Sequence, residues 1–181
     1  TLDPLLNTRI SAASKYAQTS AEAPASVTIL TSEDIRVYGH RNLLEVLESV
    51  RGFYVSSDHN YPYLGSRGFS RPSDYNNRIL VLVDGHTMNE KVWGGAPVGS
   101  DLPLDFDAIE RIEIVRGPGS VLYGTSAMFG VVNIVTKRGT DLDGLRVGAR
   151  VGSEGQREAS LAAGKALGAR GWFAVSGIAT R

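Results

Sequence analysis

The spacing of apolar and polar residues predicts short strands alternating with short helices between residues 25 and 140. Residues 26–30 have strand composition. Residues 78–83 are almost continuously apolar, which is typical of a buried strand, whereas residues 110–116 alternate and predict a half-buried one. Residues 131–136 are expected to form the last strand of this unit. The pattern therefore favours an α+β fold, a small mixed β-sheet with short helices packed on it.

Capping residues set the expected ends of two helices. Residues 31–34 (TSED) supply cap candidates and early acidic residues for a short helix that ends at Gly39. Asn42 is expected to cap a second helix, because residues 43–50 carry an apolar face at helical spacing. Gly52 is expected to end that helix.

Turn-forming residues divide the rest of this unit. Residues 53–56 have strand character, but residues 57–77 contain several prolines and glycines and are expected to be loop-rich. Asp84-Gly85 is a strong turn signal directly after a predicted strand. Residues 104–109 are expected to form one helical turn.

A different pattern begins after residue 141. Residues 145–151, 158–167 and 171–180 predict strands separated by glycine-containing turns. Strands of about ten residues with short connections are what an outer-membrane β-barrel requires. Residues 1–24 are polar and rich in small residues, and we expect a flexible arm there. The predicted organisation is therefore an arm at 1–24, a domain at 25–140 and strands at 141–181.

Composition excludes several classes of protein and site. Lysine plus arginine equal aspartate plus glutamate at 19 each, so no global excess of positive charge supports nucleic-acid binding. Cysteine is absent, which excludes disulfides and thiolate metal sites. No run of about twenty apolar residues predicts a membrane-spanning helix. The 21 glycines favour many tight turns and close backbone approaches.

Three sequence blocks resemble the plug domain of TonB-dependent outer-membrane transporters. Together they span about residues 21–137. They are residues 23–35 (APASVTILTSEDI), residues 66–69 (SRGF) followed by 77–85 (NRILVLVDG), and residues 109–124 (IERIEIVRGPGSVLYG) continuing to 130–137 (GVVNIVTK). The third block is the most specific. Met128 and Phe129 stand where many members carry smaller residues.

The resemblance implies a mechanism and a location. Related proteins thread a globular plug into a 22-stranded barrel of the outer membrane, which is too wide for side chains to fill. The resemblance implies that the plug closes this pore and contributes to binding a scarce nutrient, most often a ferric siderophore or another metal chelate. It implies the energy-coupling protein TonB as the partner on the periplasmic side, and it implies no resident cofactor. Residues 141–181 would be the first strands of the barrel.

Two arginines resemble those by which related plugs are held in the barrel. Arg67 and Arg116 each precede a glycine, and related plugs keep arginines here that pair with glutamates on the inner barrel wall. Guanidinium suits this role because it pairs bidentately and stays charged when partly desolvated. The glutamates would lie beyond Arg181. Without the resemblance, an arginine beside a glycine is most often a solvated loop charge.

The arm contains a loose resemblance to the TonB-binding segment of the family. Such segments bind by strand addition, in which backbone hydrogen bonds supply the affinity. A disordered leader, or a binding segment that precedes Thr1, are the alternatives. The TonB-contact candidates are Leu6, Thr8, Arg9, Ile10, Ser11 and Ala12.

Family comparison also assigns substrate contact to three outward loops. Exposed aromatic rings beside hydrogen-bonding groups fit an amphipathic ligand such as a metal chelate, although such rings also occur without ligands. The candidates are Asp58, His59, Tyr61, Tyr63, Arg71, Asp74, Tyr75, Lys91 and Trp93. A metal held by protein side chains is not expected, because Asp58 and His59 alone fall short of a site. The structural turn candidates are Gly68, Gly85, Gly117, Gly119, Gly124 and Gly130.

Two alternatives to this function are an enzyme and a soluble periplasmic module. An enzyme is not expected, because no Gly-x-Ser-x-Gly nucleophile motif is present and the glycine-rich stretch 117–124 lacks the lysine of a phosphate loop. A soluble periplasmic binding or signalling module that never enters a barrel is the second alternative. Three strands cannot close a barrel, so we expect this chain to be part of a longer protein. The transported nutrient and the oligomeric state are not predicted.

Overall fold

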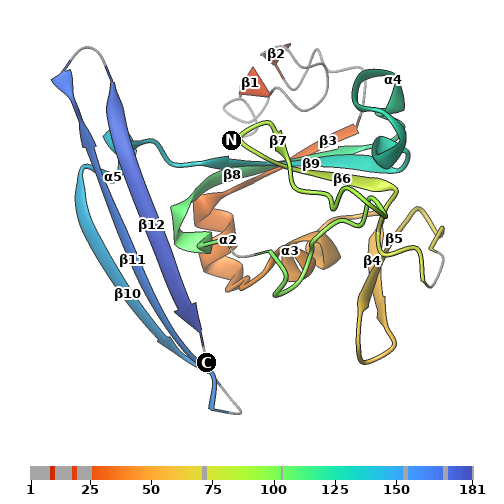
Figure 1. Cartoon of the computed structure of the whole chain (residues 1–181), viewed down its shortest axis with the longest axis horizontal. Helices are drawn as coiled ribbons and strands as arrows, with labels where there is room; N and C mark the ends of the chain where they lie inside the picture. The colour runs from red at the N-terminus through yellow and green to blue at the C-terminus, as the bar shows by residue number, and fades with distance from the viewer. Residues whose placement is uncertain are drawn as a thin grey trace. The chain divides into compact units, whose positions relative to one another are not determined.

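The computed structural model describes residues 9–10, 18–19, 26–70, 73–102, 104–152, 155–168 and 171–180. Figure 1 shows the arrangement of their elements. The strands are β1 (Arg9–Ile10), β2 (Gln18–Thr19), β3 (Ser26–Thr31), β4 (Phe53–Ser57), β5 (Pro62–Ser66), β6 (Ile79–Val83), β7 (His86–Thr87), β8 (Ile109–Arg116), β9 (Gly130–Thr136), β10 (Gly144–Val151), β11 (Arg157–Ala166) and β12 (Trp172–Thr180). The helices are α2 (Ser32–Tyr38), α3 (Leu43–Ser49), α4 (Ser120–Tyr123) and α5 (Gly139–Leu142), with 3-10 turns η1 (Phe106–Ala108) and η2 (Thr125–Ala127).

The chain divides into two compact units, which we describe separately. The first comprises residues 1–102 and 111–135, and the second comprises residues 103–110 and 136–181. In the first, five described strands form a mixed sheet in the order β3-β8-β9-β6-β7. β3 runs antiparallel to β8, and β6 runs parallel to β9. Helices α2 and α3 lie on one face of this sheet (Figure 1). This confirms the expected α+β fold.

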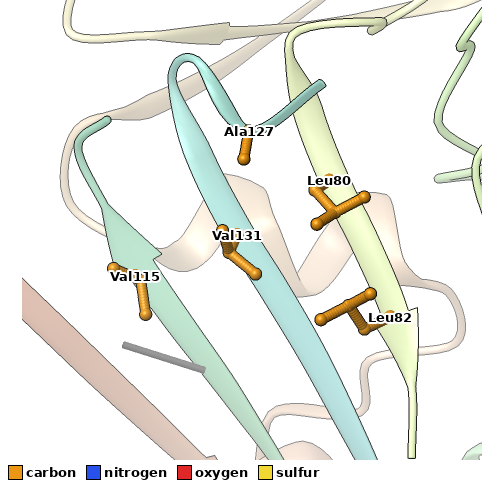
Figure 2. Packing of buried hydrophobic residues seen from close by; sticks show 5 residues of the cluster. All are labelled: Leu80, Leu82, Val115, Ala127 and Val131. Carbon is orange, nitrogen blue, oxygen red and sulfur yellow. The ribbon is translucent and has the colours of Figure 1, made fainter. Parts of the chain in front are cut away.

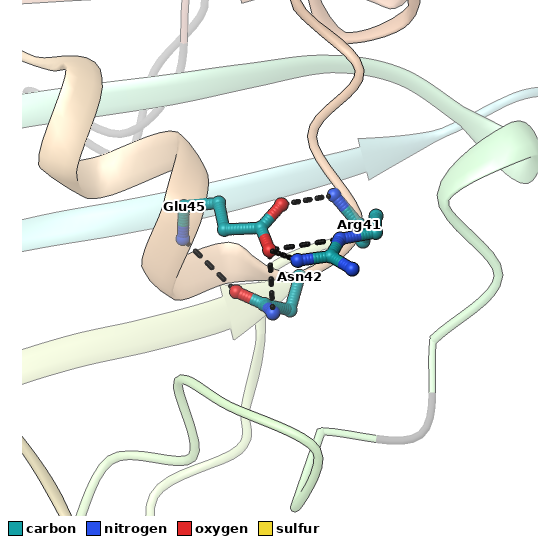
Figure 3. Close-up of polar contacts among 3 residues, drawn as sticks. All are labelled: Arg41, Asn42 and Glu45. Carbon is teal, nitrogen blue, oxygen red and sulfur yellow. Dashed lines mark hydrogen bonds and ion pairs between the residues drawn. The ribbon is translucent and has the colours of Figure 1, made fainter. Parts of the chain in front are cut away.

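Capping explains where both helices begin. At α2, Thr31 Oγ1 accepts from the Asp34 amide at 3.2 Å, and the Asp34 carboxylate accepts from the Thr31 amide at 2.8 Å. At α3, Asn42 Oδ1 accepts from the Glu45 amide at 2.9 Å (Figure 3). These bonds satisfy amides that have no partner within the helix. Both caps agree with the sequence-based expectation, although α3 ends at Ser49 rather than at Gly52.

Glu45 joins the α3 cap to the preceding residue. Its carboxylate accepts from the Arg41 amide at 2.8 Å and pairs with Arg41 Nη2 at 2.7 Å (Figure 3). Partial burial alone raises the pKa of Glu45, but the bonds and charge of Arg41 outweigh it and lower that pKa below its usual value. The carboxylate also lies in the first turn of the helix, where the helix dipole favours negative charge.

The core extends over both faces of the sheet. One cluster joins strands β6, β8 and β9 to η2 through Leu80, Leu82, Val115, Val131 and Ala127 (Figure 2). Partly buried side chains of β3 and α4 pack against it. Each residue of this cluster is less than 5% exposed. Burial of this apolar area stabilises the unit by about 25 cal/mol per Å² removed from water.

Two sequence-based expectations about strands are wrong. Residues 57–77 were expected to be loop-rich with no strand, but β5 lies within them and pairs with β4, Phe53 opposite Ser66. The pattern missed β5 because Pro62 and Gly65 interrupt a strand that is held by pairing with β4. Residues 110–116 were expected to form a half-buried strand, but Glu113 on its polar side is 0% exposed. Its carboxylate pairs with Arg111 Nη2 at 2.9 Å, which offsets the cost of burying a charge.

The second unit contains an antiparallel sheet in the order β10-β11-β12, as the sequence predicted. Helix α5 lies against β11 and β12. A Cβ atom on Gly164 would lie 2.8 Å from Gly139 Cα, so the two backbones meet without a side chain between them. Turn η1 belongs to the same unit and is capped by Asp105, whose Oδ1 accepts from the Asp107 amide at 2.9 Å. Lys137 Nζ donates to the Asp107 carbonyl at 2.6 Å.

Candidate functional site

Arg67 lies in a two-residue turn that connects β5 to Phe69. Ser66 and Phe69 exchange backbone hydrogen bonds of 3.0 Å across it. Arg67 has φ +53° and Gly68 has φ +85°, as a type I′ turn requires. A left-handed conformation is unfavourable for a residue with a Cβ atom, so the surroundings must hold Arg67 there. One contact that holds it is the hydrogen bond that the Arg67 amide donates to the Gly52 carbonyl, at 2.8 Å.

The side chain of Arg67 meets the backbone of Arg116 at this corner of the first unit. Arg67 Nη2 donates to the Arg116 carbonyl at 3.2 Å. Arg116 Nη1 donates to the Arg51 carbonyl at 2.7 Å, and its Nη2 donates to Ser26 Oγ at 2.7 Å. Arg116 Nε is buried and has no hydrogen-bond acceptor among the described residues. The last residue of β8 thus ties together the ends of β3 and of the segment that leads into β4.

No carboxylate of the described residues forms an ion pair with either arginine. Their acceptors are two backbone carbonyls and one hydroxyl. The two arginines therefore lie at one corner of the unit without an ion-pair partner from the described part of the chain. The Arg67 guanidinium is thus able to bind a carboxylate from another element or molecule.

Asp58 organises the turn between β4 and β5. Its Oδ1 accepts from the amides of Asn60 at 2.9 Å and Tyr61 at 2.8 Å, and its Oδ2 accepts from the Tyr63 hydroxyl at 2.8 Å. The Tyr61 amide is the largest cause that lowers the pKa of Asp58, followed by the Tyr63 hydroxyl. The hydrogen bond to Asp58 raises the pKa of the Tyr63 hydroxyl, and Tyr63 is 6% exposed. The Asp58 carboxylate and the Tyr63 hydroxyl are thus bonded to each other within the loop.

Three exposed aromatic residues lie on the candidate loops. Tyr61 and Tyr75 pack edge to face, with ring centroids 5.5 Å apart, and are 54% and 46% exposed. Trp93 is 74% exposed on the loop that follows β7. Lys91 and His59 are also exposed. Asp74 accepts from the Asn76 amide at 3.2 Å, so it helps to shape its own loop.

Several predicted site residues lie outside the described residues. These are Leu6, Thr8, Ser11, Ala12 and Arg71. In the arm, the backbone of Arg9 pairs with that of Thr19 and the backbone of Ile10 pairs with that of Gln18. The sequence pattern did not indicate this pairing. The prediction of a TonB contact there stays a prediction.

The predicted turn glycines fall into two groups. Gly68, Gly85, Gly117 and Gly124 have positive φ values between +82° and +134°. Gly119 and Gly130 do not, and they serve close contacts. A Cβ on Gly130 would lie 2.8 Å from the Val115 carbonyl oxygen.

Sequence reasoning missed the buried polar residues that hold the loops. Asn76 and Asn89 are 7% and 8% exposed, and both bond to strand backbones through their carboxamides. The available signal was a pair of polar residues on either side of the apolar run at 78–83. Their partners are fixed by loop conformation, which spacing alone does not reveal.

The described residues contain no group of three or more histidine, cysteine or acidic side chains placed to hold a metal ion. No helix in the described ranges is long and apolar enough to cross a membrane.

Comparison with known proteins adds a family match. The family model "TonB-dependent Receptor Plug Domain" matches residues 19–131. The vitamin B12 transporter BtuB of Vibrio vulnificus is 32% identical over an alignment of 178 residues, which covers 94% of this chain and 27% of the relative. The iron-regulated outer membrane virulence protein of Vibrio cholerae is 36% identical over 137 residues, covering 72% of this chain and 20% of the relative. The chain thus spans about a quarter of the length of these relatives.

A solved structure supports the fold at lower identity. FpvA of Pseudomonas aeruginosa, bound to heterologous pyoverdines, superposes with a TM-score of 0.75 and is 21% identical. The superposition covers 98% of this chain and 23% of the other. The matching family model is named for a receptor domain and BtuB is named as a transporter, and neither name is that of an enzyme. That agrees with the expectation of no enzymatic activity, which stays a prediction.

Proposed function

This chain belongs to the TonB-dependent receptor plug family, and we propose that it closes the pore of an outer-membrane transporter and gates uptake of a scarce nutrient. The whole transporter would comprise the plug, its own barrel and a periplasmic arm that binds TonB. The full activity requires the rest of the protein, since the chain spans only 27% of its B12-transporting relative.

The arginine pair carries this proposal. Arg67 and Arg116 present guanidinium groups that lack a carboxylate partner among the described residues. A plug held in a barrel needs strong but reversible attachment, and bidentate arginine–carboxylate pairs supply it. We assign the missing carboxylates to glutamates on the inner barrel wall.

The faces of the second sheet support a place in the barrel wall. The register aligns Leu145 with Ala163 and Val175, and Val147 with Leu161, on one face. Leu145, Val147 and Val175 are 67%, 74% and 65% exposed. The opposite face carries Arg150, paired with Glu158 at 2.6 Å, and Ser160, which donates to Asp107 Oδ2 at 3.4 Å. An apolar face toward lipid and a polar face toward the lumen is the arrangement of membrane strands.

The class of transported nutrient is inferred from the exposed side chains of the candidate loops. Tyr61, Tyr75 and Trp93 present exposed rings, and Lys91 adds a positive charge nearby in sequence. Aromatic rings beside a cation suit a large, partly apolar, anionic ligand such as a ferric siderophore or another metal chelate. The relatives are named for vitamin B12 transport and for iron regulation, so cobalamin is the second candidate.

Growth of a deletion strain tests the proposal. The gene for the full-length protein is deleted, and growth is measured on single iron or cobalamin sources with and without a plasmid copy. We expect one source to support growth only with the wild-type gene and only when TonB is present. Equal growth of both strains on every source would contradict the proposed transport.

Limited proteolysis separates this proposal from a soluble periplasmic module, which the family match does not favour. The full-length protein is digested in outer-membrane vesicles and the fragments are mapped. Residues 145–181 should resist cleavage if they are strands of the barrel wall. Rapid removal of this segment from intact vesicles would favour the soluble module.

A further inference from the structure

Two buried asparagines hold the candidate loops, because their side chains form the backbone hydrogen bonds that a neighbouring strand would form. Asn76 Oδ1 accepts from the Leu64 amide at 2.7 Å, and its Nδ2 donates to the Pro62 carbonyl at 3.1 Å. Both partners belong to β5. A carboxamide carries the same donor and acceptor as a peptide group, so Asn76 takes the place of one residue of a further strand.

Asn89 does the same for β6. Its Oδ1 accepts from the Val81 amide at 2.8 Å, and its Nδ2 donates to the Ile79 carbonyl at 2.9 Å. Strand β7 pairs only with Leu82 and Val83, and Met88 donates its amide to the Val81 carbonyl. Asn89 therefore extends the pairing of β6 beyond the end of β7. Its Nδ2 also donates to the Gly94 carbonyl at 2.8 Å, which ties the following loop to the sheet.

Each asparagine fixes the backbone beside an exposed aromatic residue. Tyr75 directly precedes Asn76 and packs against Tyr61. Trp93 directly precedes Gly94, the residue that Asn89 holds. The Trp93 amide donates to Glu90 Oε2 at 2.6 Å, which closes the turn that carries its ring.

The two loops are also joined to each other. The Ala96 amide donates to the Tyr75 carbonyl at 3.1 Å. A Cβ on Gly95 would lie 3.1 Å from the same carbonyl oxygen, so the backbones are in close contact. Tyr75 and Trp93 thus lie on connected loops with two buried points of attachment.

We propose that Asn76 and Asn89 are positioning residues that fix Tyr75 and Trp93 before a ligand arrives. This rests on the proposed function, in which these rings contact the nutrient. Ordering a loop on binding costs free energy, and a loop already ordered avoids that cost. Asparagine suits the position because aspartate lacks the donor, and an apolar side chain leaves the amides of Leu64 or Val81 unsatisfied.

Hydrogen–deuterium exchange of the full-length protein tests the positioning without any ligand. Asn89→Ala should speed exchange in a peptide covering residues 90–96 by about tenfold, because a buried hydrogen-bond pair is lost. Asn76→Ala should do the same for residues 62–66. Peptides from β8 and β9 should be unchanged. Asn60→Ala is the matched control, because it removes an exposed asparagine side chain from the same region.

A second variant keeps the test decisive if the alanine variants unfold. Asn89→Asp retains the acceptor for Val81 and loses the donor to Ile79 and Gly94. It should speed exchange at residues 90–96 while leaving β6 protected. Exchange equal to that of Asn60→Ala in both Asn89 variants would overturn the proposal.

Ligand affinity distinguishes a positioning role from a general structural one. The probes are cyanocobalamin and an iron(III) tris-catecholate complex, measured on the full-length receptor. For the probe that binds, Asn76→Ala and Asn89→Ala should raise Kd about tenfold and leave the uptake rate at saturation unchanged. Reduced saturating uptake at unchanged Kd would contradict a positioning role. Binding of neither probe by the wild-type receptor would count against the proposed ligands, while the exchange result still decides the positioning.

Discussion

Arg67 Nη2 donates to the carbonyl oxygen of Arg116 at 3.2 Å, although 49 positions separate the two residues. The bond brings the type I′ turn after β5 to the end of β8, the most specific block of the family resemblance. This bond is made by one nitrogen of the Arg67 guanidinium, whereas Arg116 Nη1 and Nη2 donate to the Arg51 carbonyl and to Ser26 Oγ. We therefore expect a carboxylate from outside the described residues to bind at this corner.

Removing either arginine should loosen the plug in its barrel. Under the proposed attachment, Arg67→Ala and Arg116→Ala are expected to lower stability against urea by about 1–3 kcal/mol, because a barrel carboxylate would lose a charged hydrogen bond. The measurement is the urea midpoint of the full-length receptor in detergent, followed by hydrogen exchange in β8. Arg36→Ala, at an exposed position on α2, is the control. Midpoints equal to this control would contradict the assigned attachment.

The α3 cap gives a second prediction. Asn42→Ala removes the acceptor for the Glu45 amide and should destabilise the plug by about 1 kcal/mol. Asn42→Ser or Asn42→Asp should restore most of the loss, since both are good caps. Denaturant unfolding of the purified protein provides the measurement. An alanine variant as stable as the wild type would show that this cap contributes nothing.

Asp105 predicts a dependence on pH. Burial is the largest cause that raises the pKa of Asp105, so the folded state favours its protonated form. The contribution of Asp105 to the free energy of unfolding is therefore fully present below the ordinary aspartate pKa of about 3.9. It is lost as pH rises through the raised pKa of the folded state. Asp105→Asn keeps an oxygen that accepts from the Asp107 amide, and its side chain cannot ionise.

That variant should be more stable than the wild type at pH 7, and the difference should vanish near pH 3. Unfolding midpoints measured across this range test both statements. Asp101→Asn, which changes an exposed aspartate, serves as the control. A constant difference across the range would exclude Asp105 as the titrating group.

Gly130 predicts a steric effect within the sheet. Gly130→Ala places a Cβ 2.8 Å from the Val115 carbonyl oxygen, a backbone atom that cannot move without shifting β8. The expected loss is about 1–3 kcal/mol, as for overpacking in a core. Gly177→Ala is a matched control, because a Cβ there meets nothing within 4 Å. Equal thermal stability of the two variants would contradict the close approach.

Local chemistry in the sequence predicted most of the fold. Thr31, Asn42 and Asp84-Gly85 were identified because caps and tight turns depend on neighbouring residues alone. Strand β5 was missed because its stability comes from β4 and from the Asn76 carboxamide, 12 and 14 positions from the residues it contacts. The burial of Glu113 was missed because alternation does not reveal which face of a strand is covered.

The roles of the candidate site residues stay predictions, and the structure adds how these residues are arranged. Arg67 and Arg116 were proposed from family resemblance, but nothing in the sequence indicates that the Arg67 side chain contacts the Arg116 backbone. Asp58 and Asp74 were expected near a ligand, yet their carboxylates accept from amides of their own loops. Polar residues on a loop serve either the loop or a ligand, and only the hydrogen bonds distinguish the two.

The pairing of β3 with β8 has a consequence for biosynthesis. Ser26 and Arg116 lie opposite each other at one end of this ladder, 90 positions apart. Closing so long a loop is slow, so the local hairpins β4–β5 and β6–β7 are expected to form first. A nascent chain that has not yet emerged past residue 116 therefore exposes β3 without its neighbour. An unpaired strand is prone to aggregation during this interval.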